Sequence, residues 1–579
     1  MNLERPQPLS DAQRRTGAHI FAAALRRHGV DVIFGQSIPA ALFLAIPHYG
    51  IRQIGYRAEN AGAYMADAYA RLSHKVAVVT AQNGPAATLL VAGLAECYKA
   101  SVPVVAVVQD VHRKMADKNA FQELDHLDLF KGVAKWTRRV TEIERLDDYI
   151  DMAFTAAASG RPGPAVIIVP IDLFNDAAPD IQRAHASSLG HYPLDRTVAD
   201  PAAVEEAASL LASARAPLII AGGGVHISDA AGELAALQET ASLPVATTAM
   251  GKGAVDEDHE LSLGVVGYFM GTRGRTRHLR EMVTQADVIL LVGNRTNQNG
   301  TDSWDLYPRD ARYIHLDIDS AEVGRNYDAL RLVGDARLTL AALSAALARR
   351  DLGTRRSARA SVAAKIAAGH ESWLAEVNNT LDLDARPIRP ERVMREVDSL
   401  LTPETVVVSD ASYSSIWVAN FLKARAAGAR FITPRGLAGL GWGFPYAIGA
   451  KVARPDAPVF ALVGDGGFAH VWSELETAHR MGVHVVLVVL NNQILGYEKH
   501  AEKALFGDYS DACDFSPVDH AAIARACGCE GVRVENPRDL LPALKEAFGR
   551  GNTTVIDVIT EQRAYPPVTA FESQDNLDY

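Results

Sequence analysis

The sequence is poor in cysteine and has no long apolar run. Four cysteines in 579 residues are too few for a disulfide framework. Cys527 and Cys529 have no second pair elsewhere, so a zinc site is not expected. The longest apolar stretches, residues 102–108 and 483–490, fall far short of the roughly 20 residues that a membrane span needs. The first residues lack the apolar core of a signal peptide, and these absences together predict a cytoplasmic protein without membrane contact.

Positive charge is also scarce. The chain has 58 Lys and Arg against 69 Asp and Glu, which gives a net charge of −11. A nucleic-acid-binding surface needs an excess of basic residues, so nucleic acid is not an expected partner. The length is enough for about three to four domains, and a small-molecule substrate is the partner that we expect.

Short β-type runs alternate with helical patterns along most of the chain. In the first part, strands are expected at 32–34, 76–79, 104–108 and 165–169, and helices at 18–28, 59–72 and 86–99. Such alternation predicts an α/β fold whose parallel sheets are covered on both faces. We expect three such domains at 1–185, 200–345 and 387–560, with a charged helical connector at 346–386 and a tail at 561–579.

A glycine-flanked aspartate follows the apolar run 459–463. It reads Gly464-Asp465-Gly466-Gly467, and the next β-type run ends in Asn491-Asn492. Because the carboxyl ends of parallel strands meet at one edge of a sheet, we expect Asp465 and Asn492 to lie close together. Their oxygens, beside open glycine backbone, suit a hard cation such as Mg²⁺ that holds a diphosphate. An aspartate that only caps a helix is the simpler alternative.

Five local patterns follow one another in register over nearly the whole chain. They are Arg57-Ala58-Glu59 with Gly62, Ala66 and Tyr69-Ala70-Arg71; Asn83-Gly84-Pro85-Ala86-Ala87-Thr88; Ala120-Phe121-Gln122-Glu123; Gly160-Arg161-Pro162-Gly163-Pro164; and Gly464-Asp465-Gly466 with Asn491-Asn492. Together they resemble the signature of thiamine diphosphate (ThDP) enzymes of the acetolactate synthase-like group.

This resemblance implies three doubly wound parallel-sheet domains: pyrimidine-binding, central Rossmann-like and diphosphate-binding. It also implies ThDP and Mg²⁺ as cofactors. In the family the catalytic glutamate and the diphosphate motif of one site come from different chains. The expected assembly is therefore a homodimer with shared active sites, further associated into a homotetramer.

The resemblance also assigns roles to single residues. Glu59 would hydrogen-bond N1′ of the aminopyrimidine, a role that needs an apolar pocket and a raised pKa. The alanines around it favour this role over that of an exposed helix residue. Leu440 stands where the family has a bulky apolar residue that bends the cofactor, although core packing would also explain it.

The remaining cofactor contacts lie around the aspartate motif. Asp465, Asn492 and the backbone carbonyl of Ile494 would bind Mg²⁺. The other expected cofactor contacts are Gly84, Gly464, Gly466 and Gly467.

Several positions depart from the family pattern. Ala58 replaces the usual histidine, and residues 293–299 lack the acidic pattern with which acetolactate synthases bind FAD, so FAD is not expected. Arg273, Arg275 and Arg277, with His278 and Arg280, form a basic cluster that is either a solvated face or a binding site for the phosphates of an ADP or coenzyme A moiety.

Glu498 follows the second asparagine by six positions, where acetolactate synthases have an apolar residue. A glutamate near this position occurs in pyruvate decarboxylases and some 2-hydroxyacyl-CoA lyases. There it can move a proton to or from the reacting group, although Glu498 could also be only a charge at a helix start. Gln122 is the third expected catalytic residue, and Phe121, Leu127 and Tyr497 are expected substrate contacts.

These observations favour a ThDP- and Mg²⁺-dependent carbon–carbon lyase or carboligase that works through a carbanion–enamine. The favoured function is a 2-hydroxyacyl-CoA lyase or a related acyl-CoA decarboxylase of the oxalyl-CoA decarboxylase branch. One alternative is the catalytic subunit of acetolactate synthase, which condenses 2-oxo acids. Another is a non-catalytic regulatory protein with the same fold. The tail is interpreted as a lid over the site or as a disordered end.

Overall fold

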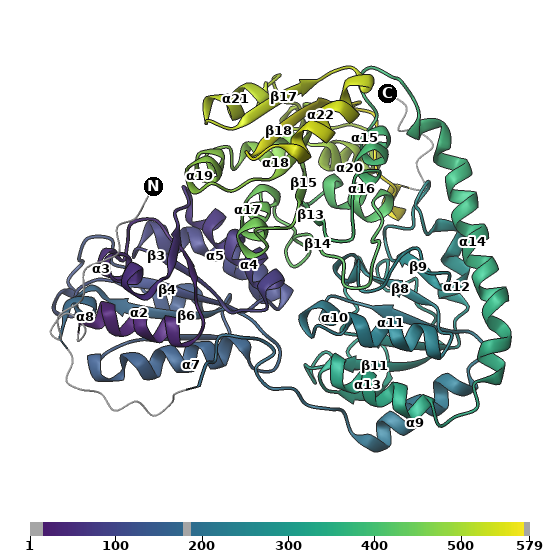
Figure 1. The fold of residues 1–579 in the computed structure, drawn as a ribbon, viewed down its shortest axis with the longest axis horizontal. Helices are drawn as coiled ribbons and strands as arrows, with labels where there is room; N and C mark the ends of the chain where they lie inside the picture. The colour runs from purple at the N-terminus through teal and green to yellow at the C-terminus, as the bar shows by residue number, and fades with distance from the viewer. Residues whose placement is uncertain (1–15, 178–186, 572–579) are drawn as a thin grey trace.

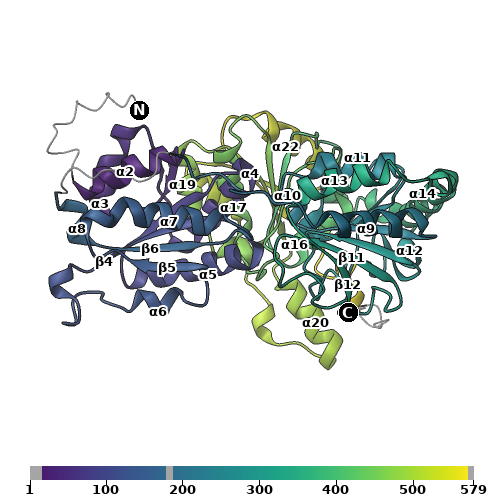
Figure 2. The same cartoon turned by 90° about the horizontal axis from the view of Figure 1, so that it is seen from below.

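A computed structural model describes residues 16–177 and 187–571 of the chain (Figure 1). The described residues form three six-stranded sheets, in which neighbouring strands run parallel. Helices lie on both faces of the sheets (Figures 1 and 2). The predicted α/β class with three doubly wound sheets is confirmed.

The first unit contains the sheet β2-β1-β3-β4-β6-β5. Its strands are β1 (Val32–Phe34), β2 (Arg52–Ile54), β3 (Ala77–Ala81), β4 (Val104–Asp110), β5 (Trp136–Arg139) and β6 (Ala165–Pro170). Its helices are α2 (Gly17–Arg27), α3 (Ala40–Ala45), α4 (Glu59–Ser73), α5 (Pro85–Ala100), α6 (His126–Phe130), α7 (Leu146–Ala158) and α8 (Ile171–Asn175). Strands β3, β4 and β6 are buried along their whole length, because helices cover both faces, and this explains their continuous apolar sequences.

The second unit contains the sheet β12-β11-β10-β7-β8-β9. Its strands are β7 (Pro217–Ala221), β8 (Val245–Thr247), β9 (Ser262–Val265), β10 (Val288–Val292), β11 (Arg312–Asp317) and β12 (Ala329–Val333). Its helices are α9 (Pro201–Ser213), α10 (Gly224–Ile227), α11 (Ala231–Thr240), α12 (Arg280–Thr284) and α13 (Ala336–Leu347). The strand order reverses between β7 and β10, which is where open α/β sheets bind ligands.

The third unit contains the sheet β14-β13-β15-β16-β18-β17. Its strands are β13 (Val406–Ser409), β14 (Phe431–Ile432), β15 (Val459–Gly464), β16 (Val486–Asn491), β17 (Glu530–Val534) and β18 (Thr554–Ile559). Its helices are α15 (Pro390–Asp398), α16 (Tyr413–Phe421), α17 (Gly443–Ala453), α18 (Asp465–Ala469), α19 (Glu474–Met481), α20 (Gly496–Phe506), α21 (His520–Ala526) and α22 (Pro537–Gly549). The first and third sheets thus have the same order of strands, with the reversal between their first and third strands.

Helices α4 and α17 join the first unit to the third (Figure 1). A Cβ on Gly449 of α17 would lie 2.1 Å from the carbonyl oxygen of Met65 on α4, so only glycine permits this approach. On the other side of α4, a Cβ on Gly93 would lie 2.3 Å from Cβ of Ala63. Small residues thus allow α4 to pack closely against both α17 and α5.

The segment expected to be a connector contains α14 (Gly353–Leu381), a helix of 29 residues that runs along the outer side of the second unit toward the third (Figure 1). Its buried residues include Ile366, Gly369, Trp373 and Val377, which recur every three or four positions and form one stripe. After β18, Thr569 donates its backbone N–H to the carbonyl oxygen of Tyr268 at 3.0 Å. This part of the tail is packed on the second unit, whereas residues 572–579 lie outside the described residues. No helix of the described chain has both the length and the apolar character that a membrane crossing requires.

A buried ion pair lies where the second unit meets the third. Lys252 Nζ is 2.7 Å from Glu257 Oε1, and both side chains are 2% exposed. Glu257 also accepts the backbone N–H of Ala424 at 3.1 Å, and Lys252 Nζ lies 5.0 Å from the ring centroid of Phe431. The pair therefore fastens the segment after β8 to the third unit.

Removing one partner of this pair would leave an uncompensated buried charge. We expect Lys252→Met to destabilise the protein by about 3–5 kcal/mol, the usual range for a broken buried pair. Lys252→Met/Glu257→Gln should recover most of that loss, because glutamine is neutral and still accepts the Ala424 N–H. Thermal and denaturant unfolding would measure both variants.

The matched control is Arg145→Met, which removes the exposed pair with Asp148 at 2.8 Å. It should cost no more than about 1 kcal/mol. Equal destabilisation by Lys252→Met and Arg145→Met would show that the buried pair does not hold the units together.

Candidate active site

A cavity opens at the carboxyl ends of the third sheet, where the strand order reverses between β13 and β15. It encloses about 1190 Å³, counting the space open to solvent. Most of its wall is made by the segments that follow β13, β15 and β16, with Tyr268 and Asn299 contributed by the second unit. This is the sheet edge at which the sequence predicts the diphosphate site.

Asp465 begins α18 in the wall of this cavity and is 6% exposed. Its carboxylate accepts the backbone N–H groups of Gly466 at 2.9 Å and Gln493 at 2.6 Å. Burial raises the pKa of this carboxyl to about 6 despite these bonds. A bound cation would supply the positive charge that favours the ionised form.

Asn492 and Ile494 follow β16 and line the same cavity. The φ of 59° at Gln493 bends the chain between them, and the Asn492 side-chain oxygen accepts the Ile494 N–H at 3.3 Å. Together with Asp465 they offer oxygen donors of which only one is a carboxylate. In the described part of the chain, no group of three or more His, Cys, Asp and Glu side chains is arranged to hold a metal. The mixed oxygen set nevertheless fits a hard cation such as Mg²⁺.

The glycines of the motif leave room beside these donors. A Cβ on Gly464 would meet nothing within 4 Å, so its backbone is open. A Cβ on Gly467 would lie 2.2 Å from Asp410 Oδ2, and one on Gly466 would lie 2.9 Å from the ring of Phe515. Side chains at Gly466 and Gly467 would therefore displace their neighbours, which explains the glycines and leaves a cradle suited to a diphosphate.

Asp410 is a site residue that the sequence analysis missed. It follows β13, is 1% exposed, and accepts the backbone N–H groups of Gly441 at 3.0 Å and Trp442 at 3.1 Å. Burial raises the pKa of its carboxyl. By holding this loop it fixes Leu440, which lines the cavity as predicted for the cofactor-bending residue. The signal was present, because Asp410 ends a β-type run just as Asp465 does.

Arg435 lines the same cavity and was also missed, since a single arginine in a loop carries no sequence signal. Its guanidinium lies 5.0 Å from the ring centroid of Phe269, and one of its terminal nitrogens donates to the Ser415 hydroxyl. Its Nε is buried without a hydrogen-bond partner. Burial is the main cause that lowers its pKa, with the neighbouring Tyr268 acting against it. No carboxylate of the described residues is within ion-pair distance of it, so a half-buried cation faces the cavity without an ion-pair partner.

Tyr497 and Glu498 lie at the start of α20 and both line the cavity. Glu498 is exposed, so its carboxylate is free to reach a ligand in the cavity. The tail contributes Ala564 to the wall, and Phe571 packs on Tyr497 with ring centroids 5.8 Å apart. The described part of the tail therefore flanks the site.

Glu59 is the first residue of α4 and is half-buried. The chain just before it is held from the third unit, because Glu474 accepts the backbone N–H groups of Arg57 at 3.1 Å and Ala58 at 3.0 Å. Glu474 is fully buried and burial raises the pKa of its carboxyl. Among the described residues, those that line the diphosphate cavity all come from the second and third units. Glu59 and Asp465 of one chain thus belong to different surfaces.

The other predicted residues of the first unit gather around Gly84. Gln122 has a φ of 60°, and its carbonyl oxygen accepts the Asn83 side-chain amide at 2.9 Å. A Cβ on Gly84 would lie 2.7 Å from that same oxygen, so glycine is required there. Phe121 is 84% exposed and Leu127 is 45% exposed. The structure therefore brings these residues together on an open face of the first unit, away from the cavity of their own chain.

Comparison with known proteins identifies the family. Three family models match the chain: "Thiamine pyrophosphate enzyme, N-terminal TPP binding domain" at residues 15–129, "central domain" at 204–343, and "C-terminal TPP binding domain" at 410–558. The chain belongs to the thiamine pyrophosphate enzyme family. It is a ThDP-dependent enzyme of the acetolactate synthase-like group, as the motifs indicated.

Relatives match over almost the whole length. The "Probable acetolactate synthase large subunit" of Methanocaldococcus jannaschii is 34% identical over 94% of this chain and 92% of its own. The "Acetolactate synthase large subunit" of Parasynechococcus marenigrum is 33% identical over 98% and 91%. The "Acetolactate synthase" of Arthrospira platensis is 32% identical over 98% of both. These names match the alternative interpretation rather than 2-hydroxyacyl-CoA lyase, the function that the sequence motifs favoured.

The residues of the basic cluster of this ThDP enzyme contact different neighbours. Arg273 lies 5.1 Å from the ring centroid of Tyr565 and Arg275 lies 5.4 Å from that of Trp373. Arg277 donates to the Thr272 hydroxyl at 2.8 Å. The remaining members pair elsewhere: His278 with Glu376 and Arg280 with Asp302. The three arginines thus have different contacts, and the chain turns between them at Arg273, whose φ is 64°. Their role in binding phosphates stays a prediction.

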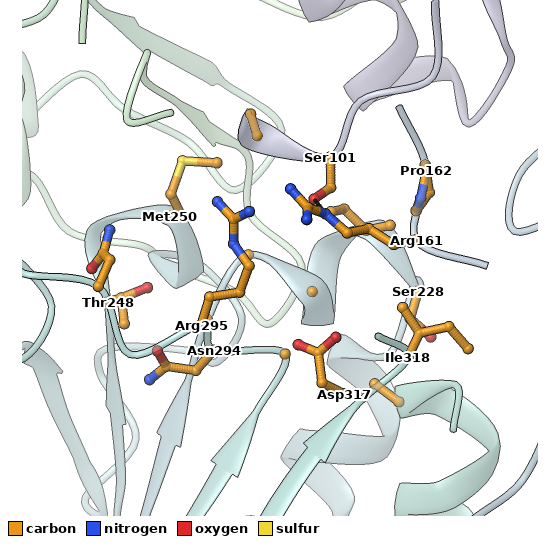
Figure 3. A pocket seen from close by; sticks show the side chains of 18 of the residues that line it. Ser101, Arg161, Pro162, Ser228, Thr248, Met250, Asn294, Arg295, Asp317 and Ile318 are labelled. Carbon is orange, nitrogen blue, oxygen red and sulfur yellow. Dashed lines mark hydrogen bonds between the residues drawn. The ribbon is translucent and has the colours of Figure 1, made fainter. Parts of the chain in front are cut away.

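A second cavity, of about 1160 Å³ with its open space, lies where the order of the central sheet reverses (Figure 3). The glycines at 222–224 follow β7 and Gly293 follows β10, and a Cβ on Gly222 would lie 2.3 Å from the Gly293 carbonyl oxygen. The two loops therefore touch through glycine backbone. Asp317, at the end of β11, points into the cavity, and burial raises the pKa of its carboxyl to about 6 (Figure 3).

Arg161 and Arg295 face each other across this cavity (Figure 3). Burial and the charge of Arg161 lower the pKa of Arg295. Arg161 Nε donates to the Ser101 hydroxyl at 2.9 Å, and its Nη1 lies 3.5 Å from Asp319. Arg161 belongs to the predicted Gly-Arg-Pro-Gly-Pro motif, whereas Arg295 lies in the segment that lacks the flavin pattern. Lys99 and Arg435 are further basic residues that line the central cavity.

The contribution of the buried Asp465 carboxylate to cofactor binding can be tested. We expect Asp465→Asn to weaken Mg²⁺-dependent ThDP binding by roughly 10–100-fold or more, at least the scale seen when groups supporting a metal site are removed. Isothermal titration of ThDP with and without Mg²⁺ would measure it.

The control is Asp511→Asn, an exposed position on the same unit, which should bind ThDP like the unchanged protein. If Asp465→Asn retained full Mg²⁺-dependent affinity, the cation would have to be held by other residues.

Proposed function

We propose that this ThDP enzyme is an acetolactate synthase-type carboligase that joins two 2-oxo acids. One molecule loses its carboxylate as CO₂, and its carbonyl carbon forms a bond to the carbonyl carbon of the second. The oxygen of that second carbonyl takes up one proton, so two pyruvate anions and a proton would give acetolactate and CO₂. The names of the relatives support this proposal, and the unpaired guanidinium of Arg435 in the diphosphate cavity carries it.

The residues fit ThDP and a divalent cation. When bound, the thiazolium of ThDP would add to the substrate carbonyl and accept the electron pair left by the lost carboxylate. Asp465, Asn492 and the Ile494 carbonyl would hold the cation and through it the diphosphate. Leu440, fixed by Asp410, would press on the cofactor from the side.

Glu59 would hold a proton at N1′ of the aminopyrimidine. Because Glu59 and Asp465 of one chain lie on different surfaces, we infer that a second copy of the chain supplies Glu59 to each cavity. Phe121, Gln122 and Leu127, which share the exposed face of the first unit, would enter the partner's cavity with it. A homodimer is therefore the smallest active form in this proposal, with a homotetramer as its further association.

Arg435 suits the carboxylate of a 2-oxo acid. A half-buried guanidinium without an anion is unfavourable, and a bidentate carboxylate is its best partner. A cation held on the departing carboxylate would stabilise the reactant more than the transition state, since that charge is lost as CO₂ forms. Arg435 is therefore better used on the second 2-oxo acid, which keeps its carboxylate throughout.

The position of Glu498 in the cavity also supports the alternative function, a 2-hydroxyacyl-CoA lyase. Its carboxylate lines the cavity and could move a proton to or from a substrate hydroxyl. A 2-hydroxyacyl-CoA lyase would need such a group together with a binding surface for coenzyme A. In the carboligase, Glu498 would donate the proton to the oxygen of the second carbonyl.

The central cavity suits a ligand that contains ADP. Glycine backbone at 222–224 and Gly293 allows close approach, and a carboxylate such as Asp317 at a strand end can accept ribose hydroxyls. Arg161 and Arg295 repel each other, and phosphate oxygens between them would relieve this repulsion. Coenzyme A, ADP and FAD all contain this moiety.

The function is tested by supplying ThDP, Mg²⁺ and either pyruvate or a 2-hydroxyacyl-CoA. We expect acetolactate from pyruvate and no cleavage of the acyl-CoA. Arg435→Met should cut the yield of acetolactate roughly tenfold or more relative to the aldehyde released, because a charge-assisted contact worth about 1.5–3 kcal/mol is lost. Arg435→Lys should restore part of it.

Product analysis separates the outcomes. Cleavage of the acyl-CoA without acetolactate would replace the carboligase by the lyase. An unchanged product ratio in Arg435→Met, with acetolactate still formed by the unchanged protein, would remove Arg435 from substrate recognition only.

The central ligand is tested by thermal shift in the presence of ThDP. We expect ADP, coenzyme A or FAD to raise the melting temperature, and Arg161→Met to abolish the rise. Exposed Arg138→Met is the control and should behave like the unchanged protein. If none of the three ligands shifted the unchanged protein at millimolar concentration, the cavity would not be a nucleotide site.

A further inference from the structure

A third cavity lies at the junction of α14, α15, the segment around β9 and the end of α16. It encloses about 1230 Å³ with its open space, and among the described residues it shares no lining residue with the diphosphate cavity or the central cavity. Its walls combine residues 257–275 with residues 363–423, so sequence patterns do not reveal it.

Arg275 is the most deeply buried basic residue that lines this cavity. The residue is only 5% exposed, and its guanidinium lies 5.4 Å from the ring centroid of Trp373, which also lines the cavity. Its backbone N–H donates to the Asn420 side chain at 3.0 Å, which fixes the position of the chain. Within the described ranges, the guanidinium itself has no hydrogen bond and no carboxylate within ion-pair distance.

Among the five carboxylates that line the cavity, those of Glu257, Asp258 and Asp398 have cations of their own. Each of these three acidic side chains pairs with a basic side chain at 2.7 Å or less. The pairs are Lys252 with Glu257 at 2.7 Å, Lys423 with Asp258 at 2.5 Å, and Arg425 with Asp398 at 2.6 Å. Arg275 has no paired carboxylate among the described residues, and burying such a cation is unfavourable.

The rest of the wall is mixed. Glu260, which pairs with Arg359 at 2.5 Å, Arg395, which lies 3.0 Å from Glu396, and the exposed Glu371 also line it. Ile366, Trp373, Leu374 and Phe421 form its apolar part, and Leu374 is 47% exposed at the rim. His370 also lines the cavity, and its Nδ1 is buried without a hydrogen-bond partner. Burial lowers the pKa of this histidine to about 4, so at neutral pH it is an uncharged group that can still share a hydrogen bond.

We propose that this cavity binds a small organic carboxylate with an apolar tail. The carboxylate would pair with the guanidinium of Arg275, which its stacking on Trp373 holds in place. The tail would lie along Ile366, Leu374 and Phe421, and the open Nδ1 of His370 would meet a polar atom of the ligand. The site is separate from the cavity proposed for catalysis and does not depend on the reaction that takes place there.

The test uses 4-methylpentanoate and its neutral analogue 4-methylpentanamide on the full-length protein loaded with ThDP and Mg²⁺. Isothermal titration, together with quenching of tryptophan fluorescence, should show saturable binding of the carboxylate. We expect at least tenfold weaker binding of the amide, because the amide cannot pair with Arg275. Arg275→Met should lose the preference for the carboxylate, and Arg273→Met, two residues away, should keep it.

A second variant guards against misfolding of Arg275→Met. Ala367 is exposed on α14 and lines the cavity, so Ala367→Phe should obstruct it while leaving Arg275 in place. Unchanged binding in Ala367→Phe, equal binding of acid and amide, or no saturable binding of the carboxylate at millimolar concentration would each overturn the proposal. Loss of carboxylate binding in Asp465→Asn would overturn it as well, since the ligand would then occupy the catalytic cavity.

Discussion

Two buried carboxylates fix the position of the first unit relative to the third. Each accepts backbone N–H groups from a segment of the other unit that carries site residues. Glu474 of α19 accepts the backbone N–H groups that precede α4, and so fixes the helix start at which Glu59 stands. In the opposite direction, Glu96 of α5 accepts the N–H groups of Gly436 at 2.7 Å and Leu437 at 2.5 Å, next to Arg435. Each unit thus positions the functional segment of the other. Because both carboxylates are almost fully buried, a shift between the units would leave backbone donors without partners.

The sequence predicted those parts of the fold and the site that depend on residues close together in the chain. Inner strands such as β4, β7 and β10 are continuous apolar runs, and the residues that end β15 and β16 meet at one sheet edge by the geometry of parallel strands. That rule alone predicts that Asp465 and Asn492 lie close together, whereas Ile494 was assigned by the family resemblance. The edge strands β5 and β12 escaped prediction, because they are half-exposed and their sequences are mixed. Asp410 was not predicted as a site residue only because the strand before it is short, although the same rule applies to it.

Other site residues could not be predicted because their role arises from packing between distant segments. Arg435 is a candidate because its guanidinium packs on Phe269 of the second unit and lines the diphosphate cavity. The arginines near position 275 looked like one cluster along the chain, but the turn at Arg273 distributes them among Tyr565, Trp373 and Thr272. Conversely, Arg161 and Arg295 are 134 positions apart and meet across the central cavity. Charged residues that are neighbours in sequence therefore need not point toward one ligand site unless they lie on a regular helix or strand.

Charge pairing offers a rule for finding ligand sites in this fold. Most buried cations here have carboxylates: Arg71 lies 2.6 Å from Asp67, and Lys252 lies 2.7 Å from Glu257. Against that background, Arg275 and Arg435 stand out, since each is held against an aromatic ring, faces a cavity and lacks an anion among the described residues. Stacking on a ring fixes a guanidinium but compensates little of its charge, at about 0.5–2 kcal/mol against several for desolvation. The cost of desolvating such a guanidinium is offset only when an anionic ligand binds to it. For this reason both cavities are interpreted as sites for carboxylates.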